Sequence, residues 1–382
     1  MKKKYFILSI LCVIFISLNL RAPITTIGPI VNELIKEFNL TNTQIGILSS
    51  IPLFCFFIFS LIAPLFQAIK SIFIALFILA LGLLLRIAYD VNTLMLGSVF
   101  IGIAIAILNV LMPSFIKSKF KDSTKIMPLY GLFLSISSLI GVFGYYLLTL
   151  IKVKGVLVFW IIFTIAAFIV FLPFIKNNRL KRKYDKKQNS NFLSIFKNKK
   201  AWIITLFMGL QSCVFYTVIS FYPSILEYKL HSSQYATLLT LIFQFVALFS
   251  AYYVPLFANK SKNQSLFLSL VCFCNIIAFT LCLFSSNLFL LGLSAILFSI
   301  PVGGIFAVAL SMIASKTKDV QSTIYLSSMA QSFGYLIAAI GPIIFGYLKD
   351  LSSNFNLSII FMLIISTLLL IFSKLSSKIS FI

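Results

Sequence analysis

Apolar runs alternate with short polar breaks along the whole chain. The breaks contain Lys, Asn, Ser, Asp and Pro, and the runs are close to the roughly 20 residues that a helix needs to cross a bilayer. The pattern predicts twelve transmembrane helices, at about residues 5–34, 43–66, 70–90, 93–116, 125–150, 155–175, 201–228, 233–257, 264–285, 287–315, 321–348 and 356–373. We therefore expect an all-α membrane protein with short loops.

The composition excludes a soluble globular protein. Of the 382 residues, 60% are hydrophobic and only 10% are charged, whereas a soluble domain is about half apolar and a quarter charged. Twelve spans account for most of this length, which leaves no room for an additional soluble domain.

Positive charge is distributed unevenly between the two sides of the predicted bundle. The chain has 31 Lys and Arg against 8 Asp and Glu. With the N-terminus inside, 24 of these cations lie on the cytoplasmic side and five lie outside, namely Lys36, Lys152, Lys154, Lys229 and Lys349. The bias predicts that both termini are cytoplasmic. We expect the basic stretch 176–200 to contact anionic lipid and expect no nucleic-acid partner.

This basic stretch also divides the chain into two halves that echo each other. APLF at 63–66 corresponds to VPLF at 254–257, and FGY recurs at 143–145 and 345–347. The predicted parts are a six-helix bundle, a linker and a second six-helix bundle, at residues 1–175, 176–200 and 201–382. Parallel repeats of this kind predict a binding site at their interface near the bilayer midplane.

Arg21 is the most unusual residue of the predicted spans. It lies about 16 residues, or roughly 24 Å, beyond the start of the first span at Tyr5. A cation at this depth costs several kcal/mol unless it faces water or an anion. All eight carboxylates fall in loops or at span ends, so the simplest counter-charge is a transported anion. The alternative is a structural arginine that binds backbone carbonyls. Thr25, four residues on, shares the face of Arg21.

Arg86 is weaker evidence for a binding site. It precedes Asp90 by four residues, so an ion pair near the outer interface explains it adequately. A role in the site is the other possibility.

Two prolines coincide with polar side chains. Pro23 frees the carbonyl of Asn19, and Pro113 frees that of Asn109. Such positions resemble the broken-helix sites of transporters, although each asparagine could equally satisfy its own kink. The sequence leaves both interpretations open.

The second half carries amides and phenols in place of charge. Gln331 and Tyr335 are four residues apart and share one helix face. Tyr222 is typical of an interfacial belt. The candidates for closing the site from this half are Gln211, Tyr216, Gln244, Gln331 and Tyr335.

Several longer strings resemble the cyanate and 2-nitroimidazole permease family of the major facilitator superfamily. They are LNLRAPITTIGPI (18–30), GILSSIPLFCF (46–56), NVLMPSFIKSKF (109–120), GLQSCVFY (209–216), YPSIL (222–226) and MAQSFGYLIAAIGPIIFGYLKD (329–350). The resemblance implies twelve helices in two bundles, alternating access, the bacterial inner membrane and small, often anionic, solutes. One departure is the loop between spans two and three, where FQAIKSIF offers Lys70 alone in place of the superfamily's acidic residue and arginines.

The sequence therefore predicts a secondary transporter for a small anionic or electronegative solute, with Arg21, Asn19, Thr25 and Asn109 in the site. We expect a monomer with a small-molecule substrate and bound lipid, without cofactor or metal. A drug or metabolite efflux carrier with an apolar pocket is the alternative. A membrane enzyme or receptor is disfavoured because the sequence has no paired carboxylates, histidine cluster or nucleophile set.

Overall fold

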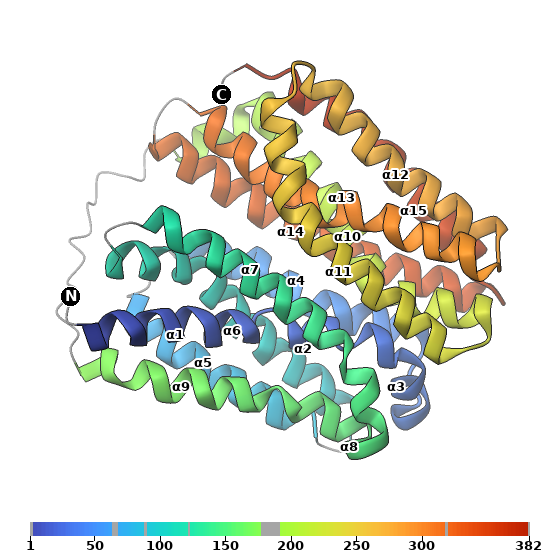
Figure 1. Ribbon diagram of the computed structural model, residues 1–382, viewed down its shortest axis with the longest axis horizontal. Helices are drawn as coiled ribbons and strands as arrows, with labels where there is room; N and C mark the ends of the chain where they lie inside the picture. The colour runs from blue at the N-terminus through green and yellow to red at the C-terminus, as the bar shows by residue number, and fades with distance from the viewer. Residues whose placement is uncertain are drawn as a thin grey trace. The chain divides into compact units, whose positions relative to one another are not determined.

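The computed structural model describes residues 3–62, 68–87, 90–120, 123–176, 192–317 and 320–380. Within these ranges every regular element is a helix and no strand occurs (Figure 1). The elements are α1 (Lys3–Asn19), α2 (Ala22–Thr25), η1 (Gly28–Ile30), α3 (Val31–Phe38), α4 (Asn42–Ile62), α5 (Ala68–Leu85), α6 (Val91–Lys119), α7 (Ser123–Val142), α8 (Gly144–Phe159), α9 (Ile161–Lys176), η4 (Phe192–Lys197), α10 (Lys199–Leu230), α11 (Ser233–Lys260), α12 (Gln264–Phe284), α13 (Leu288–Ser315), α14 (Val320–Leu351) and α15 (Asn356–Ser377).

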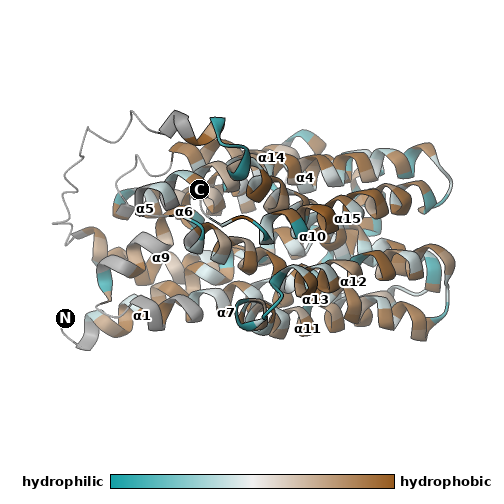
Figure 2. Cartoon of the chain, turned by 90° about the horizontal axis from the view of Figure 1, so that it is seen from above, coloured by the Kyte–Doolittle hydropathy of each residue, from teal (hydrophilic) through white to brown (hydrophobic). Residues whose placement is uncertain are grey.

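The predicted all-α membrane fold is confirmed. In the described parts of the chain, nine helical segments are long and apolar enough to cross a membrane, and a bent pair, Leu129–Val142 with Gly144–Phe159, raises the number to ten. Two shorter apolar helices are Ile69–Leu85 and Ile161–Ile175. Each of the twelve predicted segments contains helix, while the count of twelve complete spans stays a prediction. Apolar residues line the helices and polar ones gather at their turns (Figure 2).

The first span is broken where the sequence predicts one segment. α1 ends at Asn19, α2 begins at Ala22, and a 3-10 turn at Gly28–Ile30 follows before α3. Arg21 has non-helical angles, with φ −126° and ψ −42°. The chain therefore unwinds at Arg21, two residues before Pro23.

A second break separates the predicted fifth and sixth spans. Within α8, Lys152 has a positive φ of 53° and a ψ of 179°, so two helical pieces meet there at an angle. The neighbouring Lys154 approaches Glu37 to 4.0 Å and lies 5.7 Å from the Phe38 ring centroid. This turn occupies the place of the predicted loop.

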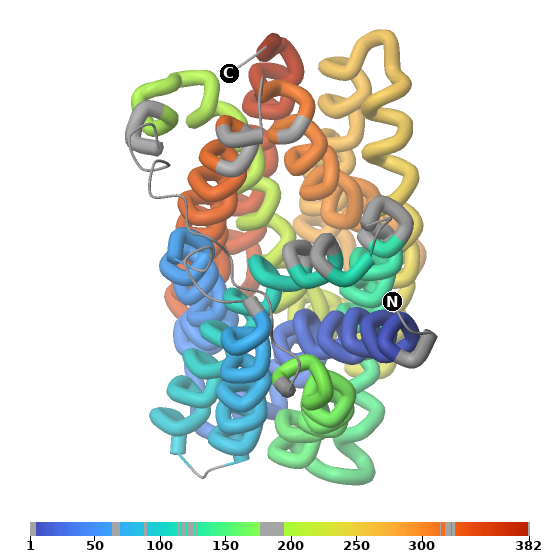
Figure 3. Tube along the Cα trace, turned by 90° about the vertical axis from the view of Figure 1, so that its left-hand side faces the viewer, coloured from blue at the N-terminus to red at the C-terminus, as the bar shows by residue number. Residues whose placement is uncertain are grey.

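Contacts between Cα atoms divide the chain into two units. The first unit comprises Met1–Leu40 and Ile51–Tyr184, and the second comprises Thr41–Ser50 and Asp185–Ile382. In the first unit, α1 packs against α9, α7 and α6, and α5 packs against α6 and α9. The blue α1 and the green α9 lie side by side in Figure 3. The predicted domain limits stay a prediction, and most of the linker lies outside the described residues.

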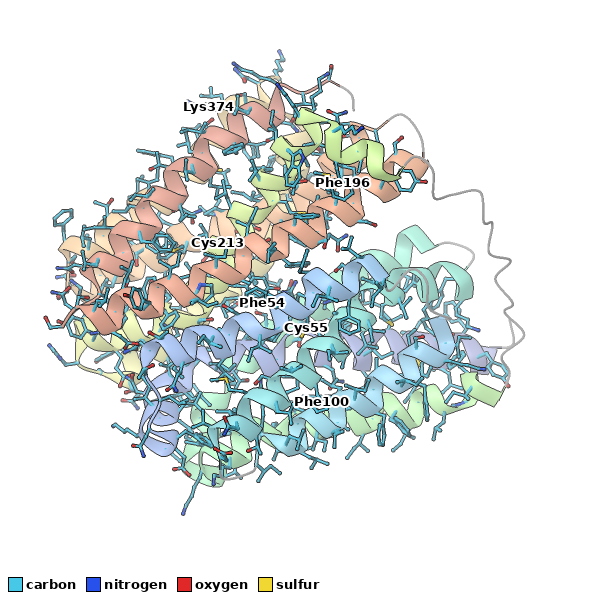
Figure 4. All side chains as sticks on the ribbon, turned by 180° about the vertical axis from the view of Figure 1, so that it is seen from behind. Phe54, Cys55, Phe100, Phe196, Cys213 and Lys374 are labelled. Atoms are coloured by element: carbon cyan, nitrogen blue, oxygen red, sulfur yellow. The ribbon has the colours of Figure 1, made fainter. Side chains whose placement is uncertain are left out.

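The second unit is built around α10. This helix packs against α14, α15, α11 and α13, and two further pairs are α11 with α13 and α12 with α15. α10 and α14 approach closely at Cys213, because a Cβ at Gly341 would lie 2.5 Å from the Cys213 sulfur (Figure 4). Such small-residue contacts are typical of helix packing in membranes.

The first residues of α4 pack on the end of α14 within this second unit. The Asp350 carboxylate accepts hydrogen bonds from the Asn42 amide nitrogen at 3.0 Å and the Thr43 amide nitrogen at 2.6 Å. A carboxylate at this position satisfies N–H groups at the start of a helix that have no helical partner. Along the same contact between α4 and α14, a Cβ at Gly46 or Gly346 would overlap a carbonyl oxygen of the facing helix. Glycine is therefore required on both sides of this contact.

Candidate functional site

The unwound turn that carries Arg21 is held by one serine of α7. The Ser137 hydroxyl donates to the Leu18 carbonyl at 2.6 Å, and its oxygen accepts from the Ala22 amide at 2.9 Å and the Arg21 amide at 3.3 Å. These backbone groups belong to the ends of two helices, where intrahelical partners are missing. A single hydroxyl thus satisfies the break inside the bilayer, where no water is at hand to do so.

Two threonines attach α2 to the same face of α7. Thr25 Oγ1 donates to the Ser138 carbonyl at 3.1 Å, and Thr26 Oγ1 donates to the Gly141 carbonyl at 3.0 Å. Both threonines are buried, and a Cβ at Gly141 would overlap the Thr25 hydroxyl. The predicted ligand Thr25 therefore has its hydroxyl in the contact between α2 and α7.

The Arg21 side chain retains accessible surface within an otherwise closed segment. Every other residue from Ile16 to Val31 is buried, whereas Arg21 is partly exposed. The guanidinium lies near enough to the Tyr130 hydroxyl for electrostatic interaction. Tyr130 in turn donates to Asn109 Oδ1 at 3.2 Å. Arg21, Tyr130 and Asn109 thus form a polar cluster from three elements, and Tyr130 and Asn109 are also partly exposed.

Asn19 belongs to a different contact. Its Nδ2 donates to the Phe15 carbonyl at 2.7 Å, and its Oδ1 accepts from the Thr164 hydroxyl at 2.6 Å. The side chain is buried against α9. The structure brings Asn109, and not Asn19, together with Arg21 through Tyr130.

The five candidates of the second half all lie in the second unit. Tyr216 on α10 and Tyr335 on α14 are in edge contact, with ring centroids 6.4 Å apart. Gln331 lies one turn before Tyr335 and donates to Ser327 Oγ at 2.9 Å. Gln211 is buried and donates to the Val302 carbonyl at 3.4 Å, and Gln244 is buried on α11. The ring contact between Tyr216 and Tyr335 therefore joins two of these candidates across α10 and α14.

The predicted ion pair between Arg86 and Asp90 is wrong. Arg86 is only 1% exposed, and its guanidinium donates to the Pro23 carbonyl at 2.8 Å and to Ser98 Oγ at 3.0 and 3.2 Å. Asp90 instead caps α6 by accepting from the Asn92 amide at 3.2 Å. Arg86 follows the last residue of α5, so helical i,i+4 spacing does not bring it to Asp90.

The prediction that Tyr222 lies in an interfacial belt is also wrong. It is 1% exposed, and its hydroxyl contacts Ser294 Oγ at 2.8 Å and donates to the Leu291 carbonyl at 3.2 Å. It is therefore a buried contact between α10 and α13 and not a residue of the interfacial belt.

Tyr130, which links Arg21 to Asn109 in the polar cluster, is a residue that sequence reasoning missed. The available signal was a phenol in the predicted span 125–150, a span that also contains Tyr145 and Tyr146. No metal-ligand cluster of three or more His, Cys, Asp or Glu side chains is present in the described ranges.

Relatives with similar sequences are bacterial transporters. The chain is 32% identical to the uncharacterized transporter YycB of Bacillus subtilis, over 92% of this chain and 89% of that protein. It is 28% identical to the 2-nitroimidazole transporter of Escherichia coli, with 94% and 93% covered. It is 22% identical to the cyanate transport protein CynX of Escherichia coli, with 91% of each chain covered. The resemblance to cyanate and 2-nitroimidazole permeases is confirmed.

Solved structures agree on the fold. A bacterial homolog of the human lysosomal transporter Spinster, in an inward-facing and occupied conformation, matches with a TM-score of 0.77 at 15% identity, over 99% of this chain and 98% of that chain. The sequence profile of the Major Facilitator Superfamily matches residues 8–279. With a helical membrane fold, a polar cluster at a broken first span and transporters as relatives, this chain belongs to the Major Facilitator Superfamily and is a multi-pass membrane transporter.

Proposed function

We propose that this secondary transporter moves a small anionic or electronegative solute across the bacterial inner membrane by alternating access. The solute class comprises cyanate-like ions, nitroimidazole-like compounds and small organic acids. Two relatives that cover more than nine-tenths of the chain are named for 2-nitroimidazole and cyanate, which supports this class. The charge bias between loops supports an orientation with both termini in the cytoplasm.

The observation that carries the proposal is the accessibility of Arg21. Its backbone is fixed by Ser137 within a segment whose other residues are buried, while Arg21 itself is partly exposed and its charge interacts with the Tyr130 hydroxyl. Intramembrane cations of this kind mark substrate pathways. A guanidinium presents several planar donors and suits carboxylate-like or nitro oxygens.

The neighbouring groups have complementary roles in this proposal. Tyr130 and Asn109 offer a phenol and an amide that accept or donate hydrogen bonds to the uncharged part of the solute. Tyr216, Tyr335, Gln331, Gln211 and Gln244 are proposed to contribute from the second half, as the repeat organisation predicts. Asn19 and Thr25 are left out of the proposed contacts because their polar atoms bind α9 and α7.

The direction of transport is restricted by energetics. Moving a monoanion into an inside-negative cell costs about 2.3 kcal/mol per 100 mV. Uptake therefore needs anion exchange, a proton carried with the solute, or consumption of the solute inside. His231, the one histidine of the chain, caps the C-terminus of α10 in a left-handed conformation. Because it lies at a helix terminus, we do not assign it a role in proton transfer.

Binding to the purified protein tests the proposal. The probes are cyanate, nitrate, formate, benzoate and 2-nitroimidazole, each measured by ligand-induced thermal stabilisation of the full-length protein in nanodiscs. We expect at least one probe to stabilise the wild type. Arg21→Gln is expected to weaken that binding about 10- to 100-fold, because a charge-assisted hydrogen bond is worth about 1.5–3 kcal/mol. Arg21→Lys keeps the charge and is expected to retain part of the affinity.

Lys36→Gln is the matched control, because it removes an exposed cation of α3 outside the proposed site. It should bind like the wild type. Equal affinity in Arg21→Gln would remove Arg21 from the site. If none of the probes binds and a lipophilic cation does, the efflux carrier with an apolar pocket replaces the proposal.

A further inference from the structure

Arg86 is a buried cation whose described partners are neutral oxygens. Its guanidinium spans from the Pro23 carbonyl in the broken first span to the Ser98 hydroxyl on α6, at 2.8 Å and at 3.0 and 3.2 Å. Burying a charge in this way is costly, and a neutral amide could satisfy one carbonyl. The forked geometry of arginine, in contrast, lets one side chain bind two elements at once.

The Pro23 carbonyl needs an outside donor because of the break. In a continuous helix it would accept from the amide of Ile27, four residues later. The Ile27 amide instead donates to the Ile24 carbonyl at 3.3 Å, where α2 passes into the 3-10 turn. Arg86 supplies the replacement donor for this carbonyl.

The close packing of α5 and α6 also leaves space for the aliphatic part of the Arg86 side chain. α5 and α6 approach backbone to backbone, since a Cβ at Gly97 would lie 2.7 Å from the Gly82 carbonyl oxygen. The same Cβ would lie 3.1 Å from Arg86 Cγ. The absence of a side chain at Gly97 lets the Arg86 side chain pass between the two helices to the first span.

We propose that Arg86 is a positioning residue for Arg21. Ser137 binds Leu18 and Ala22 on one side of the break, and Arg86 binds Pro23 on the other. The backbone from Leu18 to Pro23 is thereby held from both α7 and the α5–α6 pair, and the Arg21 side chain leaves from its middle. This inference rests on the proposed function for its consequence in binding, while the positioning itself is measurable without a solute.

The first experiment reports position without any solute. Arg21→Cys is labelled with a small methanethiosulfonate reagent in nanodiscs, and mass spectrometry follows the labelling rate at position 21 alone. Arg86→Lys, Arg86→Gln and Ser98→Ala are then added singly to this background. We expect each to change the rate several-fold, with Ser98→Ala as the mildest change because Arg86 stays. Ser135→Ala removes a hydroxyl whose described bond is to Gly131 within α7, so it should leave the rate unchanged.

The second experiment measures binding of the tightest of the five probes. We expect Arg86→Lys and Arg86→Gln each to weaken binding about tenfold, and the double variant Arg21→Gln/Arg86→Gln to bind no worse than Arg21→Gln. If Arg86→Lys binds the probe as tightly as the wild type, the positive charge at position 86 is sufficient. That result would overturn the positioning role of the Arg86 side chain. Unchanged labelling at position 21 in all three variants would also overturn it. Loss of binding in Arg86 variants while Arg21→Gln binds normally would reject the proposed function instead.

Discussion

The Thr164 hydroxyl on α9 donates a 2.6 Å hydrogen bond to the amide oxygen of Asn19, the last residue of α1. Both side chains are 1% exposed. Because the Asn19 nitrogen already binds the Phe15 carbonyl, this amide holds two helices together at the point where the first span unwinds.

Thr164→Val is therefore expected to lower the free energy of unfolding by about 1–3 kcal/mol, since it leaves a buried amide oxygen without its donor. The affinity of the folded protein for the solute should not change. Thermal unfolding and binding in detergent measure both quantities. Thr149→Val is the matched control, because the described bond of the exposed Thr149 hydroxyl is to Tyr146 of its own helix. A large loss of affinity in folded Thr164→Val would place Asn19 in the site after all.

Ser137→Ala should be costly in both stability and binding. The change leaves the Arg21 and Ala22 amides without their described acceptor and removes a donor from Leu18. We expect a loss of at least about 1–3 kcal/mol in the free energy of unfolding, together with weaker solute binding because Arg21 is displaced. Ser135→Ala removes a hydroxyl that bonds within α7 to Gly131 and should be near neutral. Similar behaviour of the two variants would show that the break is held by other contacts.

Gly346→Ala is expected to disrupt the packing of α4 on α14 in the second unit. The new methyl group would overlap the Asn42 carbonyl oxygen, and a backbone atom cannot move aside cheaply. Overpacking of this kind costs about 1–3 kcal/mol, measured as a lower unfolding temperature. Gly131→Ala adds the same methyl group where no described atom lies within 4 Å, apart from its chain neighbours and the backbone of its own helix. It should be neutral or slightly stabilising, because alanine favours helix by up to about 1 kcal/mol. Equal effects would contradict the close approach.

Tyr222→Phe tests the buried contact between α10 and α13. The hydroxyl that is removed contacts Ser294 and Leu291, but Ser294 keeps its own 2.7 Å bond to the Leu291 carbonyl. We therefore expect a moderate loss of about 0.5–1.5 kcal/mol in the free energy of unfolding. Tyr252→Phe, at a side chain that is 65% exposed, should have no measurable effect. A belt position for Tyr222 would make the two variants alike.

Arg86 shows where sequence reasoning reached its limit. The spacing to Asp90 is that of an ion pair on a helix, yet α5 ends at Leu85 and the side chain turns into the unit. Pro23, with which Arg86 makes the shortest of its described hydrogen bonds, lies 63 positions away in the chain. Sequence spacing predicts which side chains are neighbours only while the helix continues. The contact of Arg86, which lies beyond the end of α5, could therefore not be predicted from spacing.

Tyr222 and Asn19 illustrate the same limit for neutral groups. Hydropathy places a tyrosine or asparagine in a span but does not say which face is turned inward, because lipid and protein interior are about equally apolar. The Tyr222 partners Ser294 and Leu291 and the Asn19 donor Thr164 lie on helices that are distant in sequence.

The sequence alone determined that this protein is a helical membrane transporter, that its apolar segments follow one another with short breaks, and that Arg21 is an anomalous cation within the first of them. These features follow from hydrophobic length and charge, which are properties of consecutive residues. Tertiary structure alone decided that the break at Arg21 is held by Ser137, that Arg86 reaches Pro23, and that Tyr130 joins Arg21 to Asn109. Each of these depends on which helix faces which, and hydrogen bonds between distant segments become known only once the helices are packed.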